Sequence, residues 1–348
     1  NPLEALNSET DLEKSGNFAL LDIARALDWV QVNIEAFGGD KNNVTLTGFS
    51  AGGRDVMATL ISPLFEGKYH KAISYSGGMT LADKTESQDI FATALAPLVV
   101  EDGVKADEAA AKEWLLTSGQ DVQDYLHGLS ADRLAPLMGN AAIRMSVFPH
   151  LYKDGVVIPE EGFESKNYND VPLLLVTGTS EFSLFTAFDK RFATAVSDGS
   201  LFKDENLLKE FTYAETYGSQ LYRLSNTVES ARIMTENYSS PIYISQISFG
   251  DDGTSAPTVA GLLGAFHGIF EPLLQTPSNY ATFIGDDFES AGAKELSKDF
   301  KAYLKHFVTT GDPNGGDLPK WEAWTASNQE VLSMDADLKK AKIEMSSD

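Results

Sequence analysis

The sequence predicts an α/β protein with a mostly parallel central sheet and helical insertions. Three short, apolar segments have the pattern of strands, at residues 44–47, 171–178 and 241–248, and the second is apolar throughout, as buried strands of parallel sheets are. A helical stretch at 53–61 separates the first of these from another short strand pattern at 71–76. Strand, helix and strand at this spacing form a βαβ unit, whose two strands run parallel.

The remaining elements are predicted from apolar periodicity and breakers. A helix at 16–34 has apolar residues at steps of three and four and is stopped by two glycines. A last helix at 293–307 is followed by what we interpret as a polar tail. We expect a single domain over 1–348, with helical insertions at about 82–148 and 184–238.

Composition excludes several classes of function. The formal net charge is −24, which repels nucleic acid and predicts no such partner. The chain has no cysteine, so it forms no disulfide and has no thiol nucleophile or cysteine-bound zinc. Its five histidines show no metal-binding spacing. We therefore predict no metal and no cofactor. An apolar run long enough to span a membrane is missing.

Residues 48–52 read Gly-Phe-Ser-Ala-Gly and connect the first strand to its helix. A serine at a sharp strand-to-helix turn is lifted clear of the sheet, where its hydroxyl can attack a substrate. We expect Gly48 and Gly52, which lack Cβ atoms, to let strand and helix close around Ser50. The backbone N–H of Ala51 would bind a developing oxyanion.

The motif alone is weak, because a chain with 28 glycines contains G-x-S-x-G by chance at an appreciable rate. Its position between a strand and a helix supports the functional interpretation. Glu181 and His267 follow the ends of two later strands, and active sites of open parallel sheets form at those ends. Asp251 and Asp252, after the final strand, compete with Glu181 for the role of the acid.

These residue types fit nucleophilic catalysis. A serine hydroxyl becomes nucleophilic when a neutral imidazole, here that of His267, accepts its proton. The carboxylate of Glu181 would orient the imidazole and stabilise the imidazolium that forms. His267 could instead be a loop histidine with no catalytic role.

The sequence also resembles a known family, the type-B carboxylesterases, which are serine esterases and lipases that include the cholinesterases. Its matching segments run in the family's order along most of the chain. They are the lead-in helix at 16–34, Phe37-Gly38-Gly39-Asp40, the serine signature at 44–53, Lys71-Ala72-Ile73 through Ser76-Gly77, Asp154-Gly155, Gly178-Thr179-x-Glu181, Gly264-x-x-His267-Gly268 and Gly311-Asp312-Pro313-Asn314.

The resemblance implies an α/β-hydrolase fold, a small-molecule ester as substrate, and a triad of Ser50, Glu181 and His267. Two motifs depart from the family pattern, because Phe49 stands where the family usually has Glu, and the acid motif reads Ser180-Glu181-Phe182 where the family usually has Asp-Glu-Gly. Together with Phe266, Phe49 and Phe182 would form an apolar pocket for small acyl or aryl esters. The alternatives are a non-catalytic binding module on the same fold and a lipase with a lid.

A third departure concerns the first residues. The family begins with further strands and a His-Gly-Gly loop that supplies other oxyanion donors, whereas this chain opens Asn-Pro-Leu-Glu, like the interior of a longer chain. We therefore expect the N-terminal strands to be absent and the strand at 44–47 to be a sheet edge. The chain's own upstream segment or a second chain would cover that edge. We expect weak or no esterase activity from this chain alone, and its localisation cannot be assigned.

Overall fold

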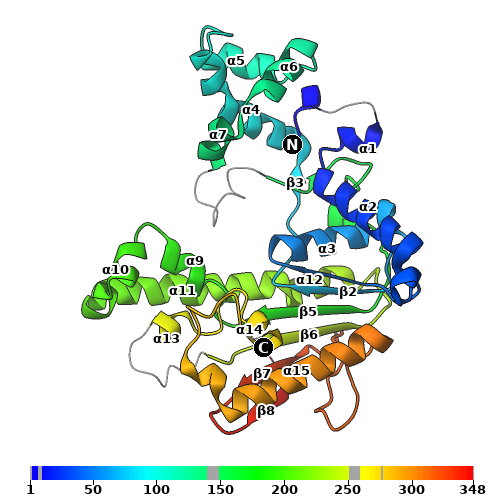
Figure 1. Ribbon diagram of the computed structural model, residues 1–348, viewed down its shortest axis with the longest axis vertical. Coiled ribbons are helices and arrows are strands. Elements are labelled where there is room, and N and C mark those ends of the chain that lie inside the picture. Colours follow the sequence, from blue (N-terminus) through cyan, green and yellow to red (C-terminus); the bar gives the residue numbers. More distant parts are fainter. Residues whose placement is uncertain (1, 7–9, 139–148, 251–258, 276, 348) are drawn as a thin grey trace. The chain divides into compact units, whose positions relative to one another are not determined.

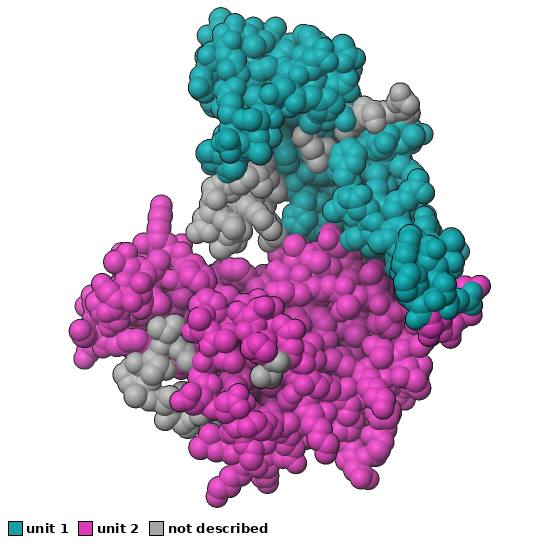
Figure 2. Space-filling model, in the orientation of Figure 1, with its two compact units in different colours: residues 1–37, 58–68, 80–169 teal, residues 38–57, 69–79, 170–348 magenta. Residues whose placement is uncertain are grey.

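The computed structural model describes residues 2–6, 10–138, 149–250, 259–275 and 277–347, and they divide into two compact units (Figures 1 and 2). Unit 1 contains residues 1–37, 58–68 and 80–169, and unit 2 contains residues 38–57, 69–79 and 170–348. The expectation of one domain over the whole chain stays a prediction. Within the described residues, no helix is both long and apolar enough to cross a membrane.

Unit 1 is mainly helical. Its elements are α1 (Asp11–Lys14), α2 (Phe18–Asn33), β3 (Ala82–Asp83), α4 (Lys84–Glu101), α5 (Glu108–Leu115), α6 (Gln120–Gly128), α7 (Ala131–Leu134) and β4 (Tyr152–Lys153). The helices from α4 to α7 lie within the expected insertion at 82–148, whose end at 139–148 is outside the described residues. Buried side chains of α4, α5 and α6 form an apolar core together with Leu3 and Ala5.

Unit 2 contains a six-stranded sheet in the order β1-β2-β5-β6-β7-β8 (Figure 1). Its strands are β1 (Thr45–Phe49), β2 (Lys71–Tyr75), β5 (Leu173–Gly178), β6 (Ile242–Ile247), β7 (Glu330–Ala336) and β8 (Ala341–Ser347). Neighbouring strands pair in parallel from β1 to β7, and β8 pairs antiparallel with β7. The three apolar segments that predicted strands are therefore in this sheet. β5 and β6 are buried at every position, whereas β1 is partly exposed along its whole length.

The helices of unit 2 follow the strands and include the second expected insertion. They are α3 (Ala51–Ile61), which begins in this unit, α9 (Ser183–Phe188), α10 (Ala193–Ser197), α11 (Glu205–Asn226), α12 (Val228–Met234), α13 (Val259–Leu263), α14 (Phe270–Leu274) and α15 (Ala291–Thr310). The side chain of Ser290 caps the start of α15, and Gly311 ends the helix in the left-handed conformation. Phe300, Tyr303 and Phe307 of α15 are buried in the same core as strand residues of the sheet.

The prediction of a polar tail after the last helix was wrong. Residues 330–336 and 341–347 form the hairpin of β7 and β8, which completes the sheet. Leu332, Met334 and Ala336, at alternating positions of β7, are buried in the core of unit 2, which offsets the polarity of the residues between them. Such strands are buried on one face, so they lack the continuous apolar run by which β5 and β6 were recognised.

Candidate active site

The nucleophile elbow connects β1 to α3. Ser50 has φ = 57°, in the left-handed region that L-residues with a Cβ avoid. Its N–H donates to the carbonyl of Tyr75 on β2 at 2.9 Å, which holds the turn against the neighbouring strand. Backbone strain of this kind costs about 1–3 kcal/mol and persists only where the surrounding structure imposes it.

The close packing of the elbow depends on glycines, although not on both that were expected. A Cβ on Gly48 would lie 2.1 Å from the carbonyl oxygen of Gly52, and one on Gly53 would lie 2.8 Å from the Cα of Gly77. A Cβ on Gly52 would have no heavy atom within 4 Å. The expectation for Gly48 is therefore confirmed, whereas that for Gly52 was wrong, because the second close approach is made by Gly53.

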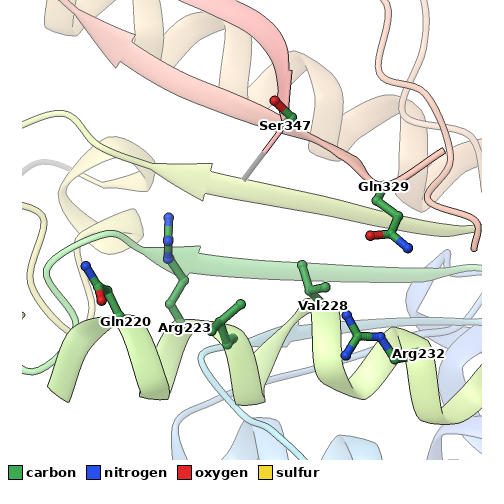
Figure 3. Close-up of a pocket in the computed structure, with 7 residues that line it drawn as sticks. Gln220, Arg223, Val228, Arg232, Gln329 and Ser347 are labelled. Carbon is green, nitrogen blue, oxygen red and sulfur yellow. The ribbon is translucent and has the colours of Figure 1, made fainter. Parts of the chain in front are cut away.

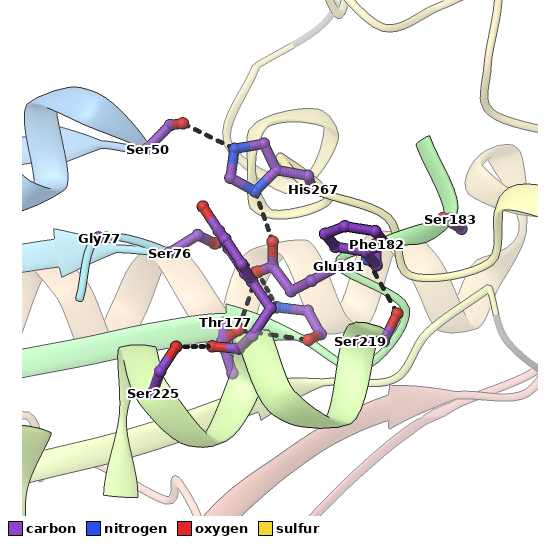
Figure 4. Close-up of polar contacts among 12 residues, drawn as sticks. Ser50, Ser76, Gly77, Thr177, Glu181, Phe182, Ser183, Ser219, Ser225 and His267 are labelled. Atoms are coloured by element: carbon purple, nitrogen blue, oxygen red, sulfur yellow. Dashed lines mark hydrogen bonds and ion pairs between the residues drawn. The ribbon is translucent and has the colours of Figure 1, made fainter. Parts of the chain in front are cut away.

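Ser50, His267 and Glu181 form one hydrogen-bonded chain (Figure 4). The Nε2 atom of His267 is 2.8 Å from the Oγ of Ser50, and its Nδ1 atom is 2.5 Å from Oε2 of Glu181. All three residues come from unit 2, at the ends of β1 and β5 and from the loop before α14. The structure thus brings together the three residues predicted to form the triad. The competing acids, Asp251 and Asp252, lie outside the described residues.

Glu181 is fully buried, and its other oxygen, Oε1, is bound by three donors. The hydroxyl of Thr177 and the N–H of Gly178 each donate to it at 2.8 Å, and the hydroxyl of Ser76 donates as well. Burial by itself would raise the pKa of Glu181, but the attraction of His267 and these hydrogen bonds outweigh it and leave the pKa below its ordinary value. The site therefore favours an ionised carboxylate beside the imidazole.

Ser76 and Thr177 were not predicted. Ser76 directly follows the last residue of β2, so the rule that polar residues at strand ends converge could have found it. Its φ of 51° resembles that of Ser50. Thr177 is within a strand pattern and carries no sequence signal for a role in the site.

Ala51 is the first residue of α3, so its N–H is among the first-turn N–H groups that have no acceptor within the helix. It directly follows Ser50, at the positive end of the helix dipole. These two facts are compatible with the oxyanion-binding role expected for Ala51.

Aromatic rings surround the imidazole of His267. The ring of Phe49 is 4.7 Å from it between centroids, that of Phe185 is 4.9 Å away, and that of Tyr222 is 5.6 Å away and edge-on. Phe182 contacts this group through Phe185, at 5.5 Å between ring centroids. Phe185 and Tyr222 were not predicted, because only the folding of α9 and α11 brings them to the loop of His267.

Phe266 does not face this aromatic group. It is 1% exposed and packs against the rings of Tyr280 and Phe283 in the core of unit 2. The expectation that Phe266 lines the substrate pocket is therefore corrected, since its ring is buried against Tyr280 and Phe283, whereas the next residue, His267, reaches Ser50.

A pocket of about 390 Å³ in unit 2 shares no residue with the triad (Figure 3). Residues of α11 and α12 line one side of it, and Gln329 and Ser347 line the other. Both of its arginines contact protein groups, because Arg223 donates to Gln246 at 2.6 Å and Arg232 pairs with Glu229 at 2.6 Å. Without a histidine in its lining, this pocket does not provide the base that a serine nucleophile requires.

Metal chemistry has no candidate ligands in the described part of the chain, where no group of three or more His, Asp or Glu could hold an ion.

Known proteins resemble this chain in sequence. A model of the carboxylesterase family matches residues 6–241. Liver carboxylesterase 1 of Oryctolagus cuniculus is 27% identical over 91% of this chain and 60% of its own length. Para-nitrobenzyl esterase of Bacillus subtilis is 25% identical over 93% of this chain and 65% of its own length. A shorter match of 73 residues to the Crystal protein of Dictyostelium discoideum is 55% identical and covers 21% of this chain and 13% of that protein.

Solved structures resemble it in fold. A carboxylesterase of Geobacillus stearothermophilus superposes with a TM-score of 0.65 at 21% identity and covers 99% of this chain and 70% of that one. A PNB esterase superposes with a TM-score of 0.62 at 22% identity, covering 94% and 65%. The fold is therefore that of the α/β-hydrolases, and this chain spans 60% of the length of the rabbit relative. Since the family model covers most of the sequence, the chain belongs to the carboxylesterase family.

Proposed function

We propose that the protein hydrolyses carboxylic esters through an acyl-serine intermediate, with Ser50 as nucleophile, His267 as general base and acid, and Glu181 as the carboxylate that orients the imidazole. The observation that carries this proposal is the continuous chain from Ser50 Oγ through both nitrogens of His267 to Glu181. Membership of the carboxylesterase family supports it independently.

The steps follow from the contacts. As Ser50 Oγ attacks the ester carbonyl, its proton passes to Nε2 of His267, and the ionised Glu181 stabilises the imidazolium. The N–H of Ala51 donates to the oxyanion of the tetrahedral intermediate. His267 then gives its proton to the leaving alcohol, and a water activated by the same imidazole releases the acid from Ser50.

The substrate is an ester with small apolar acyl or aryl groups. Phe49, Phe182, Phe185 and Tyr222 present aromatic rings on the side of the site that holds His267. Apolar groups bind such rings by burial of surface, whereas a charged acyl group would lose its hydration there.

Turnover by this chain alone is predicted to be weak. In the described part of the chain, β1 pairs with β2 alone and is the outermost strand, directly before Ser50. Ala51 is the one oxyanion donor that we assign. The loss of one donor from such a site raises the activation free energy by about 3 kcal/mol.

Two measurements on purified chain test these proposals. Turnover of a short p-nitrophenyl ester is compared between this chain and a longer chain that carries the upstream segment; full turnover by this chain alone would overturn the prediction of weak activity. Peptide mass spectrometry after treatment with a sulfonyl fluoride then locates the reactive serine. An adduct on Ser50 that is lost in His267→Ala supports the triad, whereas no adduct and no turnover in either chain would favour a non-catalytic binding module.

A further inference from the structure

A buried arginine lies one helical turn after the nucleophile. Arg54, in the first turns of α3, is 4% exposed although its guanidinium is always charged. A buried cation destabilises the fold unless its donors are bound by well-placed acceptors. Two of those acceptors are the carbonyl of Gly77, at 3.1 Å from Nε, and the hydroxyl of Tyr222, at 3.3 Å from Nη2.

Both acceptors belong to groups that touch the triad. Gly77 directly follows Ser76, whose hydroxyl donates to Glu181 and whose backbone is held at a φ of 51°. An L-residue leaves this conformation unless the neighbouring atoms are fixed, so the bond from Arg54 to the next carbonyl stabilises the turn. Arg54 thereby supports one of the donors on Oε1 of Glu181.

Tyr222 connects Arg54 to the imidazole. The ring of Tyr222 meets that of His267 edge-on, with an interplanar angle of 83°. Burial, followed by the nearby charge of Glu181, raises the pKa of Tyr222, so the phenol stays neutral and its oxygen can accept from the guanidinium. The rings of Phe182 and Phe185 also contact Tyr222, at 6.4 and 6.0 Å between centroids.

We propose that Arg54 is a positioning residue, which keeps His267 and Glu181 aligned through Tyr222 and through the turn at Ser76 and Gly77. This inference rests on the proposed triad. The guanidinium of Arg54 donates to Gly77 and Tyr222, each of which connects it to a member of the triad, so we expect its effect to be on the alignment of the triad.

The test compares Arg54→Lys, Arg54→Met and Tyr222→Phe in the full chain. Lysine keeps the charge but lacks the planar fork that reaches two acceptors, and methionine removes both. Arg223→Met is the matched control, since Arg223 is the residue after Tyr222 on α11 and donates to Gln246 at 2.6 Å. Ester turnover and the sulfonylation rate are expressed per reactive Ser50, counted by titration.

Displacement of a catalytic group by about 1 Å can cost about 100-fold in rate. We expect Arg54→Met to lower kcat about 10- to 100-fold, Arg54→Lys to lower it about 5-fold or more, and Tyr222→Phe to lower it by less. In each variant, KM should stay within about twofold of the value for the unchanged chain. The double variant Arg54→Met/Tyr222→Phe should be no slower than Arg54→Met, because Arg54→Met already removes the hydrogen bond that Tyr222→Phe removes. Arg223→Met should leave all rates unchanged.

A purely structural role gives a different result, because it lowers stability and the number of titratable sites while the rate per site stays the same. Rates per site within twofold of the unchanged chain for both Arg54 variants would overturn the proposal. A second readout does not need turnover. The downfield proton resonance of the bond between His267 and Glu181 should shift or broaden in Arg54→Met and not in Arg223→Met.

The second readout also separates this proposal from the proposed function. A resonance that responds to Arg54→Met in a chain that neither hydrolyses esters nor labels at Ser50 would count against hydrolysis and for the positioning role. A resonance that does not respond, with unchanged rates, refutes the positioning role alone.

Discussion

The hydroxyl of Ser76 donates to the buried carboxylate of Glu181, so its removal should lower the free energy of unfolding by an amount that depends on pH. Ser76→Ala leaves Thr177 and Gly178 as the donors to Oε1 of Glu181. A hydrogen bond to a charged group contributes about 1.5–3 kcal/mol. Since two donors remain, we expect the free energy of unfolding to fall by an amount near the lower end of this range, about 1.5–2 kcal/mol at pH 7.

The pH dependence follows from the pKa of Glu181, which is lower in the folded chain than in the unfolded one. Such a group stabilises the fold above its unfolded pKa of about 4.3, and this contribution is lost as pH falls through the folded pKa. The hydroxyl of Ser76 supports the ionised form. The difference in the free energy of unfolding between Ser76→Ala and the unchanged chain should therefore be largest at pH 7 and shrink as the carboxylate is protonated.

The assay is urea unfolding of unit 2, followed by tryptophan fluorescence. Trp29 and Trp114 belong to unit 1 and are replaced by phenylalanine in all variants. The remaining Trp321 and Trp324 are buried in unit 2 and report its unfolding.

The control is Ser230→Ala, which removes another buried hydroxyl. Ser230 is 1% exposed and donates to the neutral carbonyl of Ser225 at 2.7 Å. Its loss should cost about 1 kcal/mol at every pH. If Ser76→Ala costs no more than Ser230→Ala and shows the same pH dependence, our account of the buried carboxylate is refuted.

Three further predictions concern the elbow, a buried acid and the triad carboxylate. Gly48→Ala should destabilise unit 2 by about 3 kcal/mol or more, because its Cβ would lie 2.1 Å from a backbone oxygen, whereas Gly52→Ala, with open space around it, should change the unfolding free energy by about 1 kcal/mol or less. Burial raises the pKa of Asp55 to about 6, although the nearby charge of Arg54 lowers it, so ionisation of Asp55 opposes folding. Asp55→Asn should therefore raise the free energy of unfolding, measured in urea, at pH 7 and not at pH 4. Glu181→Gln should lower kcat by about 10⁴-fold, because it favours the wrong imidazole tautomer, and retention of more than a tenth of kcat would contradict the role of Glu181.

Those parts of the fold and site that depend on local patterns could be predicted from the sequence. β5 and β6 are buried on both faces and therefore have continuous apolar sequences. Ser50 lies in a motif whose backbone geometry is set by a few residues. Glu181 and His267 could be placed near it because the ends of parallel strands meet at one edge of the sheet.

The rest depended on contacts between distant segments. Arg54 and Tyr222 are 168 residues apart, and no sequence pattern pairs them. Phe266 was assigned to the pocket through its neighbour His267, although the loop turns its side chain into the core. The hairpin of β7 and β8 was missed because strands with one buried face resemble a polar segment.

The central claim is that His267 makes Ser50 nucleophilic, and the rate of Ser50 modification tests it most directly. The measurement is the second-order rate of sulfonylation, with the modified residue located by peptide mass spectrometry, in the unchanged chain and in His267→Ala. General-base assistance is worth about 100- to 10,000-fold, so we expect modification at Ser50 to be at least about 100-fold slower without the imidazole. Equal rates in the two chains, or modification at a different serine, would contradict it.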